Sequence, residues 1–199
     1  MKFFEKLKSL DLVLASQSPR RKALLEEVGF PFRIWVIPSD ESFPQDLPTN
    51  DIALYLCRQK AKPFKGLMDQ NTIVITADTI VVKGNRILNK ADNPAEARSM
   101  LSILSGTTHQ VITGVCLTSQ NHRFSFTETT TVKFTKLEPE EINHYIKTCQ
   151  PFDKAGAYGI QEWIGAVAVE SIQGSYHNVV GLPVATLYRE LKSFVENHF

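Results

Sequence analysis

Residues 12–22, LVLASQSPRRK, predict a short buried strand that leads directly into a helix. The apolar run Leu12 to Ala15 is typical of a buried strand, and Ser18 followed by Pro19 supplies an N-cap hydroxyl and a proline at the first helical position. The three cations at positions 20–22 then fall in the first helical turn, where the helix dipole favours negative charge. A bound anion would stabilise them there. The junction therefore predicts a phosphate-binding site, and the alternative is a solvated basic turn.

Four side chains of this junction are candidate phosphate ligands. Ser16 and Ser18 bring hydroxyls, and Arg20 and Arg21 bring guanidinium groups that can form two parallel hydrogen bonds to one phosphate. Lys22 has no such reason to bind a ligand, and we expect it to be solvated.

The composition restricts the possible function. The chain has 199 residues and a formal net charge of +1, so we expect that residues 1–199 form one large domain or two lobes sharing a cleft, without a linker, and bind a small anion and no long nucleic acid. Three widely spaced cysteines indicate a reducing compartment. Neither a signal-peptide core nor an apolar run long enough to span a bilayer is visible, so we expect a soluble, cytoplasmic protein without membrane contact.

Helical and strand patterns are mixed along the chain, which predicts an α/β fold with a mixed sheet. Residues 109–118 and 123–134 are β-rich and are separated by a short polar turn, which is typical of an antiparallel hairpin. Other strands are expected over 32–37, 72–77, 80–82 and 166–172, with helices over 51–62, 94–104, 138–149 and 183–197 and a loop over 174–178.

Two carboxylates follow predicted strands. Asp78 comes directly after the run 72–77, and Glu41 comes shortly after the run 32–37. Ligands of α/β sheets bind outside the carboxyl ends of strands, and two such carboxylates suit Mg²⁺ or Mn²⁺. Thr79 could add a hydroxyl. The alternatives are a turn acid at Asp78 and a surface loop acid at Glu41.

Two lysines and one loop complete the set of candidate residues. Lys60 and Lys90 could reach a phosphate as point charges, although both could equally be exposed surface lysines. The loop 153–161 contains small residues that let backbone approach a ligand, and its Tyr158 ring and Gln161 amide suit a nucleobase. His109, at the start of a strand, is interpreted as a structural histidine.

The chain lacks the motifs of several common nucleotide and metal proteins. It contains no Walker glycine loop, no G-x-G-x-x-G after a strand and no paired Cys/His motif, so kinase, dinucleotide-binding and zinc-site functions lack support.

Five ordered motifs resemble the Maf-like nucleoside triphosphate pyrophosphatases, which are also called septum-formation-inhibitor-like proteins. They are SQSPRR at 16–21, ADTI at 77–80, SGTTHQV at 105–111, DKAGAYGIQ at 153–161 and GSYHNVVGLP at 174–183. The resemblance covers about residues 11–190. It implies a strongly twisted mixed sheet flanked by helices, two lobes around a central cleft, and a homodimer.

The resemblance also implies a reaction and roles for residues. The family converts a nucleoside triphosphate to the monophosphate and pyrophosphate with a divalent metal, and the residue matching Asp78 is the general base. Positions matching Arg20, Thr79 and Gln161 are associated with substrate choice, and the spelling resembles the branch that acts on dTTP and UTP, with modified pyrimidine nucleotides as possible substrates. Asn89 and Glu162 stand where glycine is usual.

A triphosphate would fit the cations singled out above, since Arg20, Arg21, Lys60, Lys90 and a metal would neutralise it together with the Ser18 hydroxyl. We therefore predict a dTTP/UTP pyrophosphatase. The alternative is a nucleotide-binding regulator of cell division with little turnover, which would bind a nucleotide tightly and leave it intact.

Overall fold

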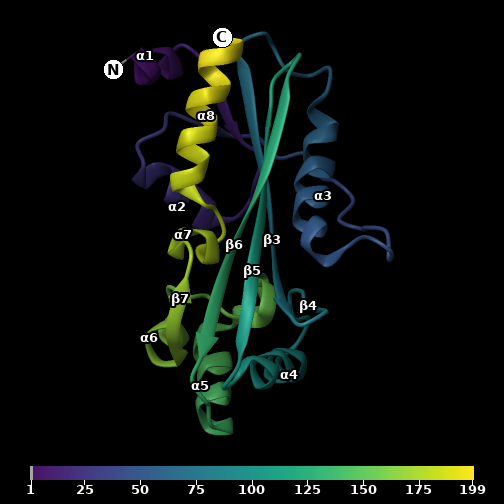
Figure 1. Cartoon of the computed structure of the whole chain (residues 1–199), viewed down its shortest axis with the longest axis vertical. Helices are drawn as coiled ribbons and strands as arrows, with labels where there is room; N and C mark the ends of the chain where they lie inside the picture. Colours follow the sequence, from purple (N-terminus) through teal and green to yellow (C-terminus); the bar gives the residue numbers. More distant parts are fainter. Residues whose placement is uncertain (1) are drawn as a thin grey trace. The chain divides into compact units, whose positions relative to one another are not determined.

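The computed structural model describes residues 2–199, which form two compact units (Figure 1). Of the described residues, the first unit comprises 2–78, 113–128 and 181–199, and the second comprises 79–112 and 129–180. Met1, the first residue of the expected domain, lies outside the described residues. The long strands β3, β5 and β6 contribute residues to both units.

The described elements follow one another in an α/β order. They are α1 (Lys2–Lys8), β1 (Asp11–Leu14), α2 (Pro19–Glu27), β2 (Arg33–Ile34), α3 (Thr49–Ala61), β3 (Thr72–Lys83), β4 (Arg86–Leu88), α4 (Pro94–Leu104), β5 (Thr108–Thr118), β6 (Arg123–Phe134), α5 (Pro139–Cys149), α6 (Trp163–Ala168), β7 (Val169–Gln173), α7 (Tyr176–Val180) and α8 (Val184–His198), with short 3-10 turns at Lys62–Phe64, Pro151–Asp153 and Ala155–Ala157.

The strands of the described residues form one seven-stranded mixed sheet, as predicted. Its order is β2-β1-β3-β5-β6-β7, with β4 paired to β3. β1 runs parallel to β2 and β3, with Val13 opposite Val74, whereas β3 pairs antiparallel with β4 and β6 pairs antiparallel with β7. The adjacent strands β5 and β6 are joined by the expected turn, in which Ser119 N–H donates to the His122 carbonyl.

The first unit packs α3 unusually close to β5. A Cβ atom on Gly114 of β5 would lie 2.3 Å from the Ala53 carbonyl oxygen of α3, so glycine is required at this contact. In Figure 1, α3 and α8 lie on either side of the strands of this unit. Apolar residues of α3 such as Leu56 are buried.

The second unit has its own hydrophobic core, in which α4 and α5 pack together. Leu101 and Leu104 of α4 and Tyr145 of α5 are fully buried there beside Phe134 of β6. Asn93 caps α4 by accepting from Glu96 N–H, and Glu138 forms a capping box with Glu141 at the start of α5.

Several sequence-based boundaries were wrong. Two strands were expected over 72–77 and 80–82, but β3 continues from Thr72 to Lys83 as one strand. Asp78 therefore lies within a strand and not after one, because β3 is paired with neighbouring strands on both sides of it. Residues 163–168 are helical and only 169–173 are extended, and the loop expected at 174–178 contains the start of α7. Short apolar runs fit a helix and a strand equally well, and their tertiary surroundings decide between the two.

At the amino-terminal end, two further boundaries differ from the prediction. The strand expected over 32–37 is reduced to Arg33–Ile34, and the helix expected to begin at Asp51 begins at Thr49, with Pro48 as its N-cap. Within the described part of the chain, no helix is both long and apolar enough to cross a bilayer.

Candidate active site

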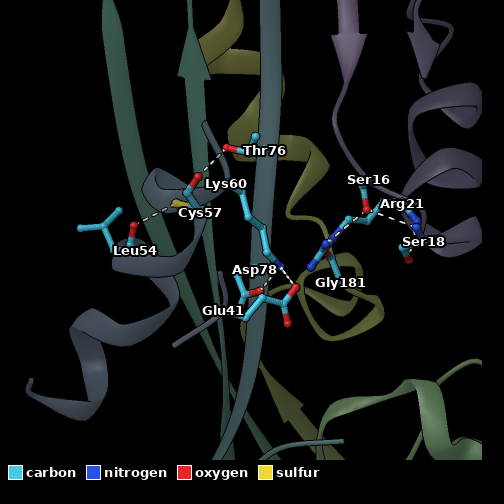
Figure 2. A network of polar contacts seen from close by, with 10 residues as sticks. All are labelled: Ser16, Ser18, Arg21, Glu41, Leu54, Cys57, Lys60, Thr76, Asp78 and Gly181. Carbon is cyan, nitrogen blue, oxygen red and sulfur yellow. Dashed lines mark hydrogen bonds and ion pairs between the residues drawn. The ribbon is translucent and has the colours of Figure 1, made fainter. Parts of the chain in front are cut away.

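One lysine of the first unit joins the two candidate carboxylates (Figure 2). The Lys60 ammonium lies 2.5 Å from Asp78 Oδ1 and 3.0 Å from Glu41 Oε1. The Lys60 and Asp78 side chains are only 18% and 12% exposed, whereas Glu41 lies on the loop after β2 and is 57% exposed. The structure therefore brings together a buried acid from β3, a lysine from α3 and a solvent-facing acid from the loop after β2.

A hydrogen bond between α3 and β3 explains why Lys60 and Asp78 meet. Thr76 Oγ1 donates to the Cys57 carbonyl oxygen at 2.7 Å, and both residues are fully buried. Thr76 and Asp78 share one face of β3, and Cys57 and Lys60 share one face of α3. The buried hydrogen bond sets the position of the helix along the strand. Asp78 comes two residues after Thr76 and Lys60 three residues after Cys57, so the ion pair forms next to this hydrogen bond (Figure 2).

The strand-to-helix junction of residues 12–22 forms as predicted, and three of its side chains contact one another. Ser18 caps α2 by accepting from Arg21 N–H, and the Ser16 hydroxyl accepts from Ser18 N–H at 3.2 Å and from Arg21 Nη1 at 3.4 Å. Arg21 Nε donates to the Gly181 carbonyl at 2.9 Å. The guanidinium is thus held by oxygen atoms on two sides.

The electrostatics of Arg21 connect this junction with the carboxylates. Burial lowers the pKa of Arg21, while the negative charges of Asp78 and Glu41 act in the opposite direction. Arg20 also lowers the pKa of Arg21, because the two neighbouring cations repel each other. Figure 2 shows the Arg21 side chain pointing toward the two acids. Lys22 is turned away to an exposed i,i+4 pair with Glu26.

The other three candidates belong to the second unit. Thr79 is partly exposed in β3, Lys90 is exposed after β4, and Gln161 is exposed at the end of its loop. Their positions on the surface of this unit leave each able to meet a ligand.

The loop 153–161 differs from the prediction at Tyr158. This side chain is 5% exposed and its hydroxyl lies 2.8 Å from His109 Nε2, so Tyr158 belongs to the core and cannot present its ring to a nucleobase. His109 is structural, as expected. Burial lowers the pKa of His109 to about 4, so the imidazole is neutral at physiological pH.

The sequence did not predict the contacts of several polar groups in the two units. The Gly181 carbonyl that holds Arg21 is a backbone group, so only its position in the motif 174–183 could have pointed to it. In the second unit, Lys154 pairs with Asp153 and Glu162 beside the buried Tyr145. Two adjacent charged residues, Asp153 and Lys154, before a run of small residues were the available signal.

The donor set of the first unit fits a hard divalent cation. Asp78 and Glu41 each place one oxygen within 3.0 Å of the same positive charge, the Lys60 ammonium. Among residues 2–199, no cluster of three or more His, Cys, Asp or Glu side chains has metal-binding geometry. Mg²⁺ commonly takes one or two carboxylates and completes its shell with water and substrate phosphates, and two acids suffice for that arrangement.

Comparison with known proteins agrees with the motifs. The family model described as "Maf-like protein" matches residues 11–194. A Phocaeicola vulgatus protein named "dTTP/UTP pyrophosphatase" is 48% identical over 189 residues, which cover 94% of this chain and 98% of that relative. A Parabacteroides distasonis protein of the same name is 48% identical over 191 residues, or 96% and 99% of the two chains.

A solved structure, that of the Staphylococcus aureus Ham1 protein, aligns over 95% of this chain and 100% of its own, with a TM-score of 0.49 and 11% identity. The sequence matches therefore carry the assignment. Together with the five ordered motifs, they show that this chain belongs to the Maf-like protein family.

Proposed function

We propose that this protein is a nucleoside triphosphate pyrophosphatase that converts dTTP and UTP to the monophosphate and pyrophosphate. The observation that carries the proposal is the Lys60 ammonium between Asp78 and Glu41, with Arg21 pointing toward the same acids. The two cations can neutralise the phosphates of the substrate, and a carboxylate beside them can activate the attacking water. The names of relatives that match over nearly the whole chain support the same substrates.

In the proposed reaction, Asp78 acts as general base. Its carboxylate accepts a proton from water, the water oxygen forms a bond to the α-phosphorus, and the bond from the α-phosphorus to the bridging oxygen breaks to release pyrophosphate. In the metal-free protein, the Lys60 ammonium contacts the Asp78 carboxylate at 2.5 Å and orients it. Arg21, with Arg20 and the hydroxyls of the junction 12–22, binds the phosphate oxygens on which negative charge increases.

Asp78 and Glu41 are the residues that would hold the divalent metal, Mg²⁺ or Mn²⁺. When bound, the metal supplies a positive charge that makes water more acidic and shields the phosphates. Lys60, now shared between the two acids, would then turn its ammonium to a phosphate. Its long side chain permits this movement without a change in the backbone.

The remaining expectations stay predictions. We propose substrate contacts for Thr79, Lys90 and Gln161, as the family resemblance implies, with Gln161 contacting the nucleobase. A homodimer and a cytoplasmic location are likewise proposed on the resemblance and the composition.

The purified protein with Mg²⁺ or Mn²⁺ should release equal amounts of pyrophosphate and monophosphate from UTP and dTTP. In water enriched in ¹⁸O, phosphorus NMR should find the label in the monophosphate, since water attacks the α-phosphorus. Label in pyrophosphate would show attack at the β-phosphorus and contradict the mechanism. Release of orthophosphate, or no turnover with either metal, would contradict the function.

A further inference from the structure

Glu162, the residue after Gln161, has contacts at both of its carboxylate oxygens. Glu162 Oε1 lies 2.9 Å from the Lys154 ammonium, and Glu162 Oε2 accepts a hydrogen bond from the Tyr145 hydroxyl of α5. Lys154 also lies 2.6 Å from Asp153 Oδ1 and is only 10% exposed in its side chain, so the ammonium is enclosed by acids of its own loop. Glu162 therefore has one main position.

The same tyrosine holds the turn in front of Gln161. The Tyr145 oxygen accepts from Gly159 N–H at 3.0 Å while its hydroxyl proton goes to Glu162. Burial, and next the hydrogen bond to Glu162, raise the pKa of Tyr145, so the hydroxyl keeps the proton that it donates. Trp163 adds an apolar attachment, with its ring stacked near Tyr145 at 6.5 Å between centroids.

The space above Gly159 shows how the Gln161 amide is oriented. A Cβ atom built on Gly159 would meet Glu162 Cδ at 2.9 Å, Glu162 Oε2 at 3.0 Å and Gln161 Nε2 at 3.0 Å. The amide nitrogen of Gln161 and the carboxylate of Glu162 therefore lie on the same side of this turn. A carboxylate attracts the amide N–H₂ group and repels the amide oxygen, so it favours the orientation in which Gln161 Oε1 faces away from Glu162.

That orientation distinguishes pyrimidines. Uracil and thymine have a hydrogen-bond donor at N3, whereas cytosine has an acceptor there. An outward amide oxygen can accept from the N3–H of uracil and thymine but meets the lone pair of cytosine N3. An amide free to rotate by half a turn would offer N–H instead and accept cytosine equally well.

We propose that Glu162, held by Tyr145 and Lys154, fixes the orientation of the Gln161 amide and thereby sets the preference for uracil and thymine over cytosine. These three are positioning residues, since they act through Gln161. The inference rests on the proposed function, in which Gln161 contacts the nucleobase.

The test compares kcat/KM for UTP and CTP in the wild type and in Glu162→Gln and Tyr145→Phe. Glu162→Gln keeps the size of the side chain but removes the charge, so the ratio of the UTP value to the CTP value should fall by about tenfold. Tyr145→Phe removes the anchoring hydroxyl and should lower the ratio less. The double variant should show no further fall, because both changes release the same amide.

Glu170→Gln is the matched control. Its carboxylate forms an exposed pair with Lys133 at 2.7 Å in the same unit and lies outside the loop 153–161. The ratio of UTP to CTP turnover of this variant should equal that of the wild type. If Glu162→Gln and Tyr145→Phe lower UTP and CTP turnover by the same factor, the network only stabilises the loop and the inference is wrong.

The wild type separates the two proposals. Pyrophosphate release from UTP and CTP at equal kcat/KM would overturn the inference and leave the pyrophosphatase activity standing. Absence of pyrophosphate release from UTP, dTTP and CTP would overturn both.

Discussion

Two lysines of this protein each contact two carboxylates, Lys60 in the first unit and Lys154 in the second. Lys60 joins acids from a loop and a strand that lie 37 positions apart, Glu41 and Asp78, whereas the partners of Lys154 are Asp153 and Glu162 of one short loop. Both ammonium groups are shielded, with 18% and 10% of their side chains exposed.

The difference lies in what surrounds the acids. In the second unit, the other oxygen of Glu162 is occupied by a buried tyrosine hydroxyl, so the cluster is complete within the protein. In the first unit, Glu41 is 57% exposed on a loop without regular secondary structure. Each unit thus contains one lysine between two acids. We infer that the cluster of the first unit can rearrange around a ligand, whereas the cluster of the second unit keeps its loop in one conformation.

The largest effect is expected from Asp78→Asn. An amide cannot accept the proton of the attacking water, so kcat for UTP should fall by about a thousandfold or more while circular dichroism stays unchanged. Steady-state pyrophosphate release measures the loss. Asp69→Asn, at an exposed acid of the same unit, is the control and should keep full activity. An active Asp78→Asn enzyme would assign the base elsewhere.

Lys154→Met tests whether the cluster of Lys154, Asp153 and Glu162 stabilises the second unit. The change leaves Glu162 partly buried without its cation and should lower the free energy of unfolding by about 3 kcal/mol in urea titrations. Divalent metal should not restore it. Lys133→Met removes one partner of an exposed pair and should change stability by less than about 0.5 kcal/mol. Equal losses in the two variants would contradict the importance of burial.

The stability of the second unit should also depend on pH. His109 has its pKa lowered to about 4 by burial, whereas an unfolded histidine titrates near 6.5, so the unfolded state binds more protons between these values. The contribution to stability is complete above about pH 6.5 and should decrease by about 2 kcal/mol from pH 7 to pH 5. His109→Gln should reduce this slope in urea titrations at several pH values. An unchanged slope would assign it to other groups.

The smallest effect is expected from Lys60→Met in the absence of substrate. Asp78 and Glu41 would then repel each other, and stability should fall by about 1 kcal/mol, because Glu41 can turn to solvent and the positive charge of Arg21 still acts on Asp78. Mn²⁺ should restore this loss and raise the melting temperature of the variant more than that of the wild type, since no ammonium competes for the acids. Lys62→Met, at an exposed neighbouring lysine, should respond to Mn²⁺ as the wild type does. A smaller response of Lys60→Met would contradict metal binding at these acids.

Local sequence was sufficient wherever a few neighbouring residues decide a structure. Ser18 and Pro19 predicted the start of α2, a helix was expected over 94–104, and α2 and α4 both begin where expected. Local sequence failed where a short apolar run fits two structures, as at residues 166–168, which are helical. It also failed at Tyr158, because a tyrosine in a glycine-rich loop gives no indication that its hydroxyl is bonded to His109 in the core.

By itself, the sequence of this protein determined the α/β class, the strand-to-helix junction of residues 12–22 and, through five ordered motifs, membership of the Maf-like family. Only the tertiary structure decided that Lys60 lies between Asp78 and Glu41, and that Glu162 is held between Lys154 and Tyr145. The reason is physical. Helix caps and strand patterns arise from contacts within a few residues, whereas the partner of a charge depends on the packing of distant elements, such as the approach of α3 to Gly114 and its hydrogen bond to Thr76.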